Sequence, residues 1–139
     1  MSDYYRGDQK TGVSAPDLSK NVGFADHIVK ARGKKTQYTS VSSDPEKITI
    51  FGESLYHLRR DQIAANEHVL VEHDQLISAL QEEARNSDKG TRLKAVLAQR
   101  YARMRREGLV VWKCDVSRVD KKDLITWMYR YIQVYFERR

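Results

Sequence analysis

The chain has 139 residues, enough for one domain with a modest hydrophobic core. It contains 40% hydrophobic and 32% charged residues and only two prolines, so extensive disorder is not expected. Cys114 is the only cysteine, which excludes an intrachain disulfide and a zinc site with two cysteine ligands. Neither a signal-peptide segment nor an apolar run of membrane-spanning length is present, so we expect a soluble protein that acts in the cytosol.

Charge is distributed unevenly along the chain. Residues 1–84 hold 10 Lys and Arg against 13 Asp and Glu, whereas residues 85–139 hold 15 against 6. The two parts therefore carry −3 and +9, which gives the net charge of +6. A basic C-terminal part attracts polyanions, above all nucleic acid, although a solvated basic surface without a partner has the same composition.

The first half of the chain predicts strands separated by short helices. Residues 1–35 show little periodicity, and we expect irregular structure with a short helix near 24–32. Residues 36–42 alternate polar and bulky β-forming side chains, which predicts a strand. A short helix should begin at Ser43 or Asp44 and end at Gly52.

Two more strands are predicted at 55–60 and 69–71, with a turn between them. Asp74 should then cap a helix that runs to about Arg85. The apolar face of this helix is expected to contain Leu76, Ile77, Leu80 and Ala84.

The basic part predicts two helices and a strand. A helix is expected at 91–106, followed by a stop at Gly108 and a buried strand at 109–112. Its apolar face would contain Leu93, Val96, Leu97, Tyr101 and Met104, which recur at helical spacing. The final helix, from Asp120 or Lys121, is apolar nearly all round, so it should lie deep in the fold or meet a partner chain.

Three short segments suggest an enzyme site. They are Tyr5-Arg6-Gly7-Asp8, the serine strand Tyr38-Thr39-Ser40-Val41-Ser42, and Asn66-Glu67-His68-Val69-Leu70-Val71. Their order resembles the ADP-ribosyltransferase superfamily, which carries an arginine or histidine strand, a Ser-x-Ser strand and a glutamate strand. The first two segments resemble the toxin-type branch, and the third is more similar to the poly(ADP-ribose) polymerase branch.

The resemblance implies an α+β fold with a compact split β-sheet core and a basic, mainly helical C-terminal extension. Residues 1–85 would form the NAD-binding catalytic core, and residues 86–139 would pack on it within a single domain. NAD would be the substrate. The implied catalytic residues are Glu67, Ser40 and Arg6, and the implied NAD-binding residues are Arg6, Gly7, Tyr38, Ser40, Ser42 and Phe51. No metal site is expected.

The resemblance also assigns roles to these residues. Glu67 would bind the ribose 2′-hydroxyl and stabilise the cationic transition state, with Ser40 positioning it and Ser42 as lesser support. Arg6 would brace the pocket and the NAD phosphates, and the Gly7 backbone would hold the carboxamide. Tyr38 or Phe51 would stack on nicotinamide.

Departures from the family pattern bear on the acceptor. Members that modify protein arginines usually have an acidic residue two positions before the glutamate, and here that residue is Ala65. The polymerase branch has histidine in place of Arg6, so a single transfer of ADP-ribose is expected. The lack of an acid at position 65 and the basic C-terminal part together favour nucleic acid as the acceptor, with RNA preferred to DNA. A protein acceptor is the alternative. The expected contacts are Lys89, Arg92, Lys94, Arg100, Arg103, Arg105 and Arg106.

Small transferases of this kind resemble the toxin modules of bacterial competition and toxin–antitoxin systems. That resemblance implies a neutralising immunity or antitoxin protein as partner. It adds delivery into a target cell as part of a larger effector as one route to the cytosol. No membrane partner is expected, because the sequence has no apolar run of membrane-spanning length.

Two other functions are compatible with the sequence. The helix at 91–106 and the strand after it are similar to the helix and wing of a winged-helix DNA-binding regulator. The aromatic final helix is compatible with an adaptor or antitoxin-like module that binds another protein.

Overall fold

The computed structural model describes residues 3–30, 34–47, 52–86 and 88–139. Within these ranges the strands form one antiparallel sheet in the order β4-β5-β2-β1-β3-β6. The strands are β1 (Tyr5–Asp8), β2 (Tyr38–Ser42), β3 (Ser54–Leu58), β4 (Val69–Val71), β5 (Glu107–Val111) and β6 (Phe136–Arg138). The helices are α1 (Phe24–Val29), α2 (Arg60–Ala65), α3 (His73–Glu83), α4 (Lys89–Arg105) and α5 (Leu124–Ile132), with short 3₁₀ turns η2 (Lys121–Asp123) and η3 (Gln133–Tyr135). The expected α+β class is confirmed.

The sheet is nearly divided in the middle. β1 and β2 are joined by one described residue pair, Tyr5 with Ser42, whereas the pairings of β2 with β5 and of β1 with β3 each extend over several residues. One half therefore contains β4, β5 and β2, and the other contains β1, β3 and β6. We call the junction between β1 and β2 the seam.

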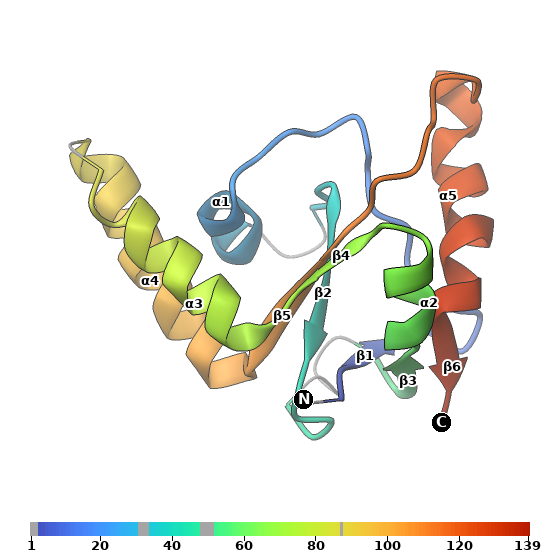
Figure 1. Ribbon diagram of the computed structural model, residues 1–139, viewed down its shortest axis with the longest axis horizontal. Coiled ribbons are helices and arrows are strands. Elements are labelled where there is room, and N and C mark those ends of the chain that lie inside the picture. The colour runs from blue at the N-terminus through green and yellow to red at the C-terminus, as the bar shows by residue number, and fades with distance from the viewer. Residues whose placement is uncertain (1–2, 31–33, 48–51, 87) are drawn as a thin grey trace.

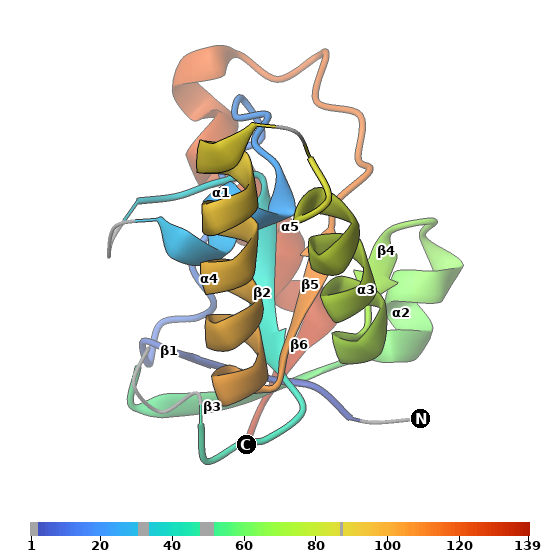
Figure 2. The same cartoon turned by 90° about the vertical axis from the view of Figure 1, so that its left-hand side faces the viewer.

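Helices cover the two faces of the sheet differently. In Figures 1 and 2, α1, α3 and α4 lie together on one side of the strands, and α2 and α5 lie on the other. Leu109 packs with the first group, whereas Val41 and Val110 pack with Ile63 of α2 and Met128 of α5. This alternation follows from the two-residue period of a strand, so Ser40, Ser42 and Glu107 belong to the face under α1, α3 and α4.

Several local predictions agree with these elements. Strands occur at the predicted places in 36–42, 55–60 and 69–71, and α3 buries Leu76 and Leu80 as expected. Glu72 precedes α3 and forms a reciprocal capping box with Gln75, so the helix begins one residue before the predicted cap.

Other local predictions need correction. The six residues of α2 form a helix, whereas the sequence predicts a strand end and a turn there. The short helix after Ser43 is a turn over 45–47 in the described part, and residues 48–51 lie outside the described ranges. Gly108 does not stop the helix, because α4 is capped by Arg106. Gly108 lies within β5, where a Cβ atom would come within 2.8 Å of the Tyr4 ring.

The apolar face predicted for the basic helix is wrong. α4 packs on α1 and α3 through Ala95, Ala98 and Ala102, which are all fully buried. The larger side chains point outward, and Leu93, Val96, Leu97 and Met104 are 61%, 57%, 40% and 62% exposed. Small side chains allow helices to approach closely, so alanine occupies the inner face of α4.

The C-terminal part is not a separate extension of the core. β5 lies between β4 and β2, and β6 pairs with β3, so residues after 86 supply strands to both halves of the sheet. The expected division at residues 85 and 86 therefore does not separate two structural units. None of the described helices has both the length and the apolar character needed to span a membrane.

Candidate active site

Arg6 connects the two halves of the sheet at the seam. Its Nη1 donates to the carbonyl oxygen of Ser40 in β2 at 3.0 Å. Its Nε donates to Asp8 Oδ2 at 3.2 Å, and its Nη2 donates to Ser14 Oγ at 3.2 Å. Asp8 is 6% exposed and also accepts hydrogen bonds from the Ser14 backbone and hydroxyl. The guanidinium group is thus fixed from three directions.

Glu107 lies on the other side of Ser40. It is the first residue of β5 and is only 3% exposed. The Ser40 hydroxyl donates to Glu107 Oε2 at 3.1 Å, and Arg105 Nη1 lies 3.6 Å from Oε1. Burial raises the pKa of the Glu107 carboxyl, while Arg105, the Ser40 hydrogen bond, Lys30 and Arg6 act in the opposite direction.

The local sequence explains why this glutamate faces Ser40. Arg106 ends α4 in the left-handed conformation, with φ of 51°, so the chain turns directly into β5. In the antiparallel register Ser42 pairs with Glu107 and Ser40 pairs with Leu109. Glu107 is therefore diagonal to Ser40 on one face of the sheet, a separation that a glutamate side chain spans.

His27 of α1 extends this network by one side chain. Its Nε2 lies 2.6 Å from Ser40 Oγ, and its Nδ1 contacts the Thr36 hydroxyl. Burial, followed by the charges of Lys30, Arg6 and Arg105, lowers the pKa of His27 from 6.5 to about 3. The imidazole is therefore neutral at neutral pH.

Neutral His27 gives the hydrogen bonds one direction when Glu107 is ionised. The single Ser40 proton is donated to the carboxylate, so Ser40 Oγ must accept from His27 Nε2–H. Nδ1 then has a lone pair and accepts from the Thr36 hydroxyl. The order of donation is Thr36, His27, Ser40, Glu107, and it fixes the Ser40 hydroxyl toward the carboxylate.

Positive charge surrounds the Glu107 carboxylate. Lys30 Nζ donates to the His27 carbonyl oxygen at 3.0 Å, and burial lowers the pKa of Lys30, with Glu107 acting against that shift. Arg6, Lys30 and Arg105 thus all lie close enough to Glu107 to affect its ionisation. Arg6 is paired with Asp8, so two carboxylates stand against three cations, which still leaves a net positive site that suits an anionic ligand.

A cleft of about 600 Å³ lies beside the residues that hold Arg6. It is bordered by the segment after β1 and by the start of α5, and Tyr129 at its edge donates to the Thr11 carbonyl oxygen at 2.5 Å. The lining residues are Asp8, Gln9, Thr11, Gly12, Ser14, Ala15, Lys35, Ile125, Thr126 and Tyr129. Asp8 and Ser14 belong to both the cleft and the Arg6 network.

The structure does not bring Glu67 to this site. Glu67 lies in an exposed turn between α2 and β4, with φ of 63°, and not on a strand. β5 separates β4 from β2, so two strand spacings place the β4 end of the chain roughly 10 Å from β2. Val69, two residues after Glu67, pairs with Val111 at the opposite end of β5 from Glu107. The prediction that Glu67 lies on a strand beside Ser40 is therefore wrong.

The other predicted NAD-binding residues differ in their placement. Gly7 is buried in β1 next to Arg6. Tyr38 is half-buried, donates to the Val22 carbonyl oxygen at 3.0 Å, and packs against the rings of Phe24 and His27. The Ser42 hydroxyl donates to the Arg105 carbonyl oxygen at 2.5 Å, which ties β2 to the end of α4. Phe51 lies outside the described residues.

Three residues near Ser40 were missed by sequence reasoning: His27, Lys30 and Glu107. Arg105 was predicted, but as a nucleic-acid contact. The signal for Glu107 was a lone acid placed directly before the apolar residues of a predicted buried strand. No comparable local signal exists for His27 or Lys30, because tertiary contacts of α1 bring them to Ser40.

The predicted nucleic-acid contacts lie on α4 and just after it, but not all beside this site. Lys94 pairs with Asp26 of α1 at 2.6 Å. At 1.5 Å per residue α4 is roughly 25 Å long, so Lys89 and Arg92 are far from its C-terminal end. Only the C-terminal end, with Arg103, Arg105 and Arg106, adjoins Glu107.

Comparisons of the chain with protein-family models, with curated proteins and with solved structures found no match.

The dependence of protein stability on acidic pH tests whether His27 is neutral in the folded protein. Its folded pKa of about 3 lies below the unfolded value of 6.5, so the unfolded chain binds one more proton between these pH values. The contribution of His27 to the unfolding free energy is fully present above pH 6.5 and is lost as the pH falls toward 3. Replacing His27→Gln keeps one donor and one acceptor without titration. We expect the loss of unfolding free energy between pH 7 and pH 5 in urea to shrink by roughly 2 kcal/mol. An equal loss in both proteins would contradict a neutral buried His27.

Proposed function

We propose that this protein is an NAD-dependent mono-ADP-ribosyltransferase with Arg6, Ser40 and Glu107 as its catalytic residues. The observation that carries the proposal is the contact of these three residues on adjacent strands β1, β2 and β5. The arginine segment and the Ser-x-Ser strand are two of the features by which the sequence resembles the superfamily, and Glu107 would take the role that the resemblance gave to Glu67. The narrow seam between two sheet halves also fits the expected split core.

The chemistry needs one carboxylate near the ribose of NAD. When the bond from C1′ to the nicotinamide nitrogen breaks, its electron pair leaves with nicotinamide and positive charge develops on the ribose. Glu107 would stabilise that charge and accept a hydrogen bond from the 2′-hydroxyl, with Ser40 and His27 fixing its orientation. An acceptor oxygen or nitrogen then bonds to C1′ and loses its proton.

The cations would bind the pyrophosphate. We propose that Lys30 and Arg105, whose side chains are long and lie close to Glu107, turn to the phosphates when NAD binds and uncover the carboxylate. Arg6 is fixed by Asp8 and Ser14 and would keep its place at the seam. The neighbouring cleft offers room for the remainder of the dinucleotide.

The residue two positions before Glu107 bears on the acceptor. It is Arg105, where family members that modify protein arginines usually have an acid. A cation there disfavours an arginine acceptor and favours an anionic one, so we propose nucleic acid, with RNA before DNA. Arg103 and Arg106 at the end of α4 would contact its phosphates, since Arg105 is assigned to the NAD pyrophosphate.

The other two candidate functions have less support. A winged-helix regulator would need the strand after α4 as a peripheral wing, but β5 is an inner strand between β4 and β2. The aromatic helix proposed for an adaptor is partly used in the fold, since Met128 and Ile132 of α5 are fully buried and Trp127 stacks on Tyr131.

The experiment that tests this function uses radiolabelled NAD with separate pools of RNA, DNA and protein. We expect label in RNA, and Arg106→Glu should lower that transfer roughly tenfold at low salt by removing one phosphate contact and adding repulsion. Hydrolysis of NAD without acceptor should be unchanged. Arg130→Glu on α5 makes the same charge change away from the site and is the matched control. Label in none of the pools would refute the transferase, and label in protein alone would refute the nucleic-acid acceptor.

A further inference from the structure

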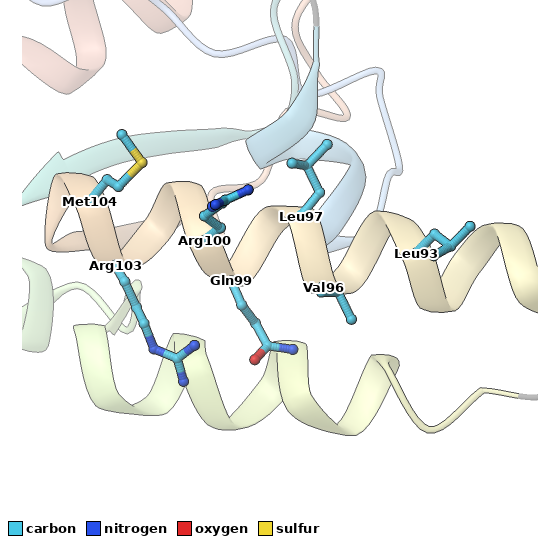
Figure 3. Close-up of a pocket in the computed structure, with 7 residues that line it drawn as sticks. All are labelled: Leu93, Val96, Leu97, Gln99, Arg100, Arg103 and Met104. Carbon is cyan, nitrogen blue, oxygen red and sulfur yellow. The ribbon is translucent and has the colours of Figure 1, made fainter.

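The outward face of α4 carries large apolar side chains that the fold does not use. Leu93, Val96, Leu97 and Met104 are each at least 40% exposed, while alanines make the contacts to α1 and α3. Together with Arg100 they form what we call the α4 surface. Figure 3 shows these side chains projecting from the helix. They line a depression of about 540 Å³.

The spacing of the α4 surface is that of a buried helix face. Positions 93, 96, 97, 100 and 104 follow the i, i+3, i+4, i+7, i+11 pattern by which one helix packs on another. Four exposed large apolar residues in one stripe are unusual on a protein that has no partner there. Because α4 packs internally through Ala95, Ala98 and Ala102, the stripe is not needed for the domain core.

Charge restricts what can cover this surface. α4 contains six Lys and Arg residues and no Asp or Glu. A second copy of the chain would bring two such helices together and place Arg100 near its own copy, which is repulsive. The surface is therefore complementary to a helix with acidic side chains.

Two other polyanions fit less well. Nucleic acid would pair its phosphates with the arginines but would leave Leu93, Leu97 and Met104 in water. An anionic bilayer would bury the apolar side chains, but Arg100 lies within the stripe and would enter the apolar layer with them. A protein helix can place a carboxylate opposite Arg100 and apolar side chains on either side of it.

We propose that the α4 surface docks an acidic amphipathic helix of a partner protein. The apolar face of the partner helix covers Leu93, Leu97 and Met104, and its carboxylates pair with Arg100. This proposal does not depend on the transferase activity. The α4 C-terminal end adjoins Glu107, so a partner bound here also approaches the candidate active site.

The test uses fluorescence anisotropy with a labelled helical peptide of about six turns that has leucines at i, i+3, i+4 and i+7 positions flanked by glutamates. Controls are a scrambled peptide of the same composition and a peptide with lysine in place of glutamate. Phosphatidylserine vesicles and a single-stranded RNA serve as the alternative polyanions. We expect saturable binding of the acidic helical peptide and at least roughly tenfold weaker binding of both control peptides.

Variants of exposed residues locate the binding. Arg100→Glu should weaken the acidic peptide about tenfold and improve the lysine peptide, and Leu97→Ser with Met104→Ser should weaken both. Val134→Ser and Arg130→Glu make matched changes on exposed residues outside the α4 surface and should have no effect. Hydrolysis of NAD without acceptor should be unaffected by all of these variants, so the two proposals fail separately. Absent peptide binding, equal binding of the scrambled peptide, unchanged affinity in the α4 variants, or binding confined to vesicles or RNA would overturn the docking site.

Discussion

Replacing Glu107→Gln is expected to lower the release of nicotinamide from NAD by about 100- to 1000-fold. Loss of one preorganised charge-stabilising group at a reacting centre typically has an effect of this size. The amide is close in size to the carboxylate and still accepts the hydrogen bond from Ser40. The substitution therefore removes the charge and leaves the shape of the site.

The stability of the Glu107→Gln variant shows whether its lower activity comes from the missing charge or from unfolding. Burial raises the pKa of Glu107, so its folded pKa exceeds the unfolded one and the ionised form is disfavoured in the fold. As the pH rises from the unfolded pKa of Glu107 to its folded pKa, ionisation of the buried carboxyl lowers the unfolding free energy. The amide of the variant does not ionise, so it does not lower stability in this way. We expect the variant to unfold in urea at pH 7 at the same or a higher concentration than the parent protein. Reduced activity with strongly reduced stability would not support a catalytic role.

Replacing Arg6→Gln is expected to destabilise the protein by about 2–3 kcal/mol as well as inactivate it. The guanidinium bonds Ser40, Asp8 and Ser14, and its removal leaves the nearly buried Asp8 carboxylate without a positive partner. The sheet halves also lose their side-chain link across the seam. Urea unfolding at pH 7 measures the change.

A double variant tests the reason for that instability. Arg6→Gln combined with Asp8→Asn should be less destabilised than the sum of the two single variants, by about 1 kcal/mol or more. Strict additivity would contradict a direct coupling between the two charges. Activity should stay low in the double variant, because the glutamine side chain introduced at position 6 cannot replace the guanidinium at Ser40.

Much of the secondary structure could be predicted because it depends on local patterns of polar and apolar residues. Alternation identified β2, and the apolar spacing of Leu76 and Leu80 identified the face of α3. The orientation of α4 could not be predicted in this way. Periodicity favours large apolar residues for the inner face, whereas close packing on α1 and α3 selected Ala98 and its neighbours.

Two of the three proposed catalytic residues could be found from the sequence, and the third could not. Arg6 and Ser40 lie in recognisable segments, and their strands are neighbours in the sheet. The glutamate depends on which strand pairs with β2, a long-range choice that joins residues 67 positions apart, Ser40 and Glu107. Glu67 precedes β4, and β5 separates β4 from β2, so Glu67 does not lie beside Ser40.

The most direct test compares nicotinamide release by Glu107→Gln and Glu67→Gln in one assay with labelled NAD. The two substitutions make the same chemical change, one at the buried carboxylate beside Ser40 and one in an exposed turn. We predict that Glu67→Gln keeps the activity of the parent protein within about twofold, while Glu107→Gln loses at least roughly 100-fold. No release by the parent protein, or a loss confined to Glu67→Gln, would contradict an active site at the seam.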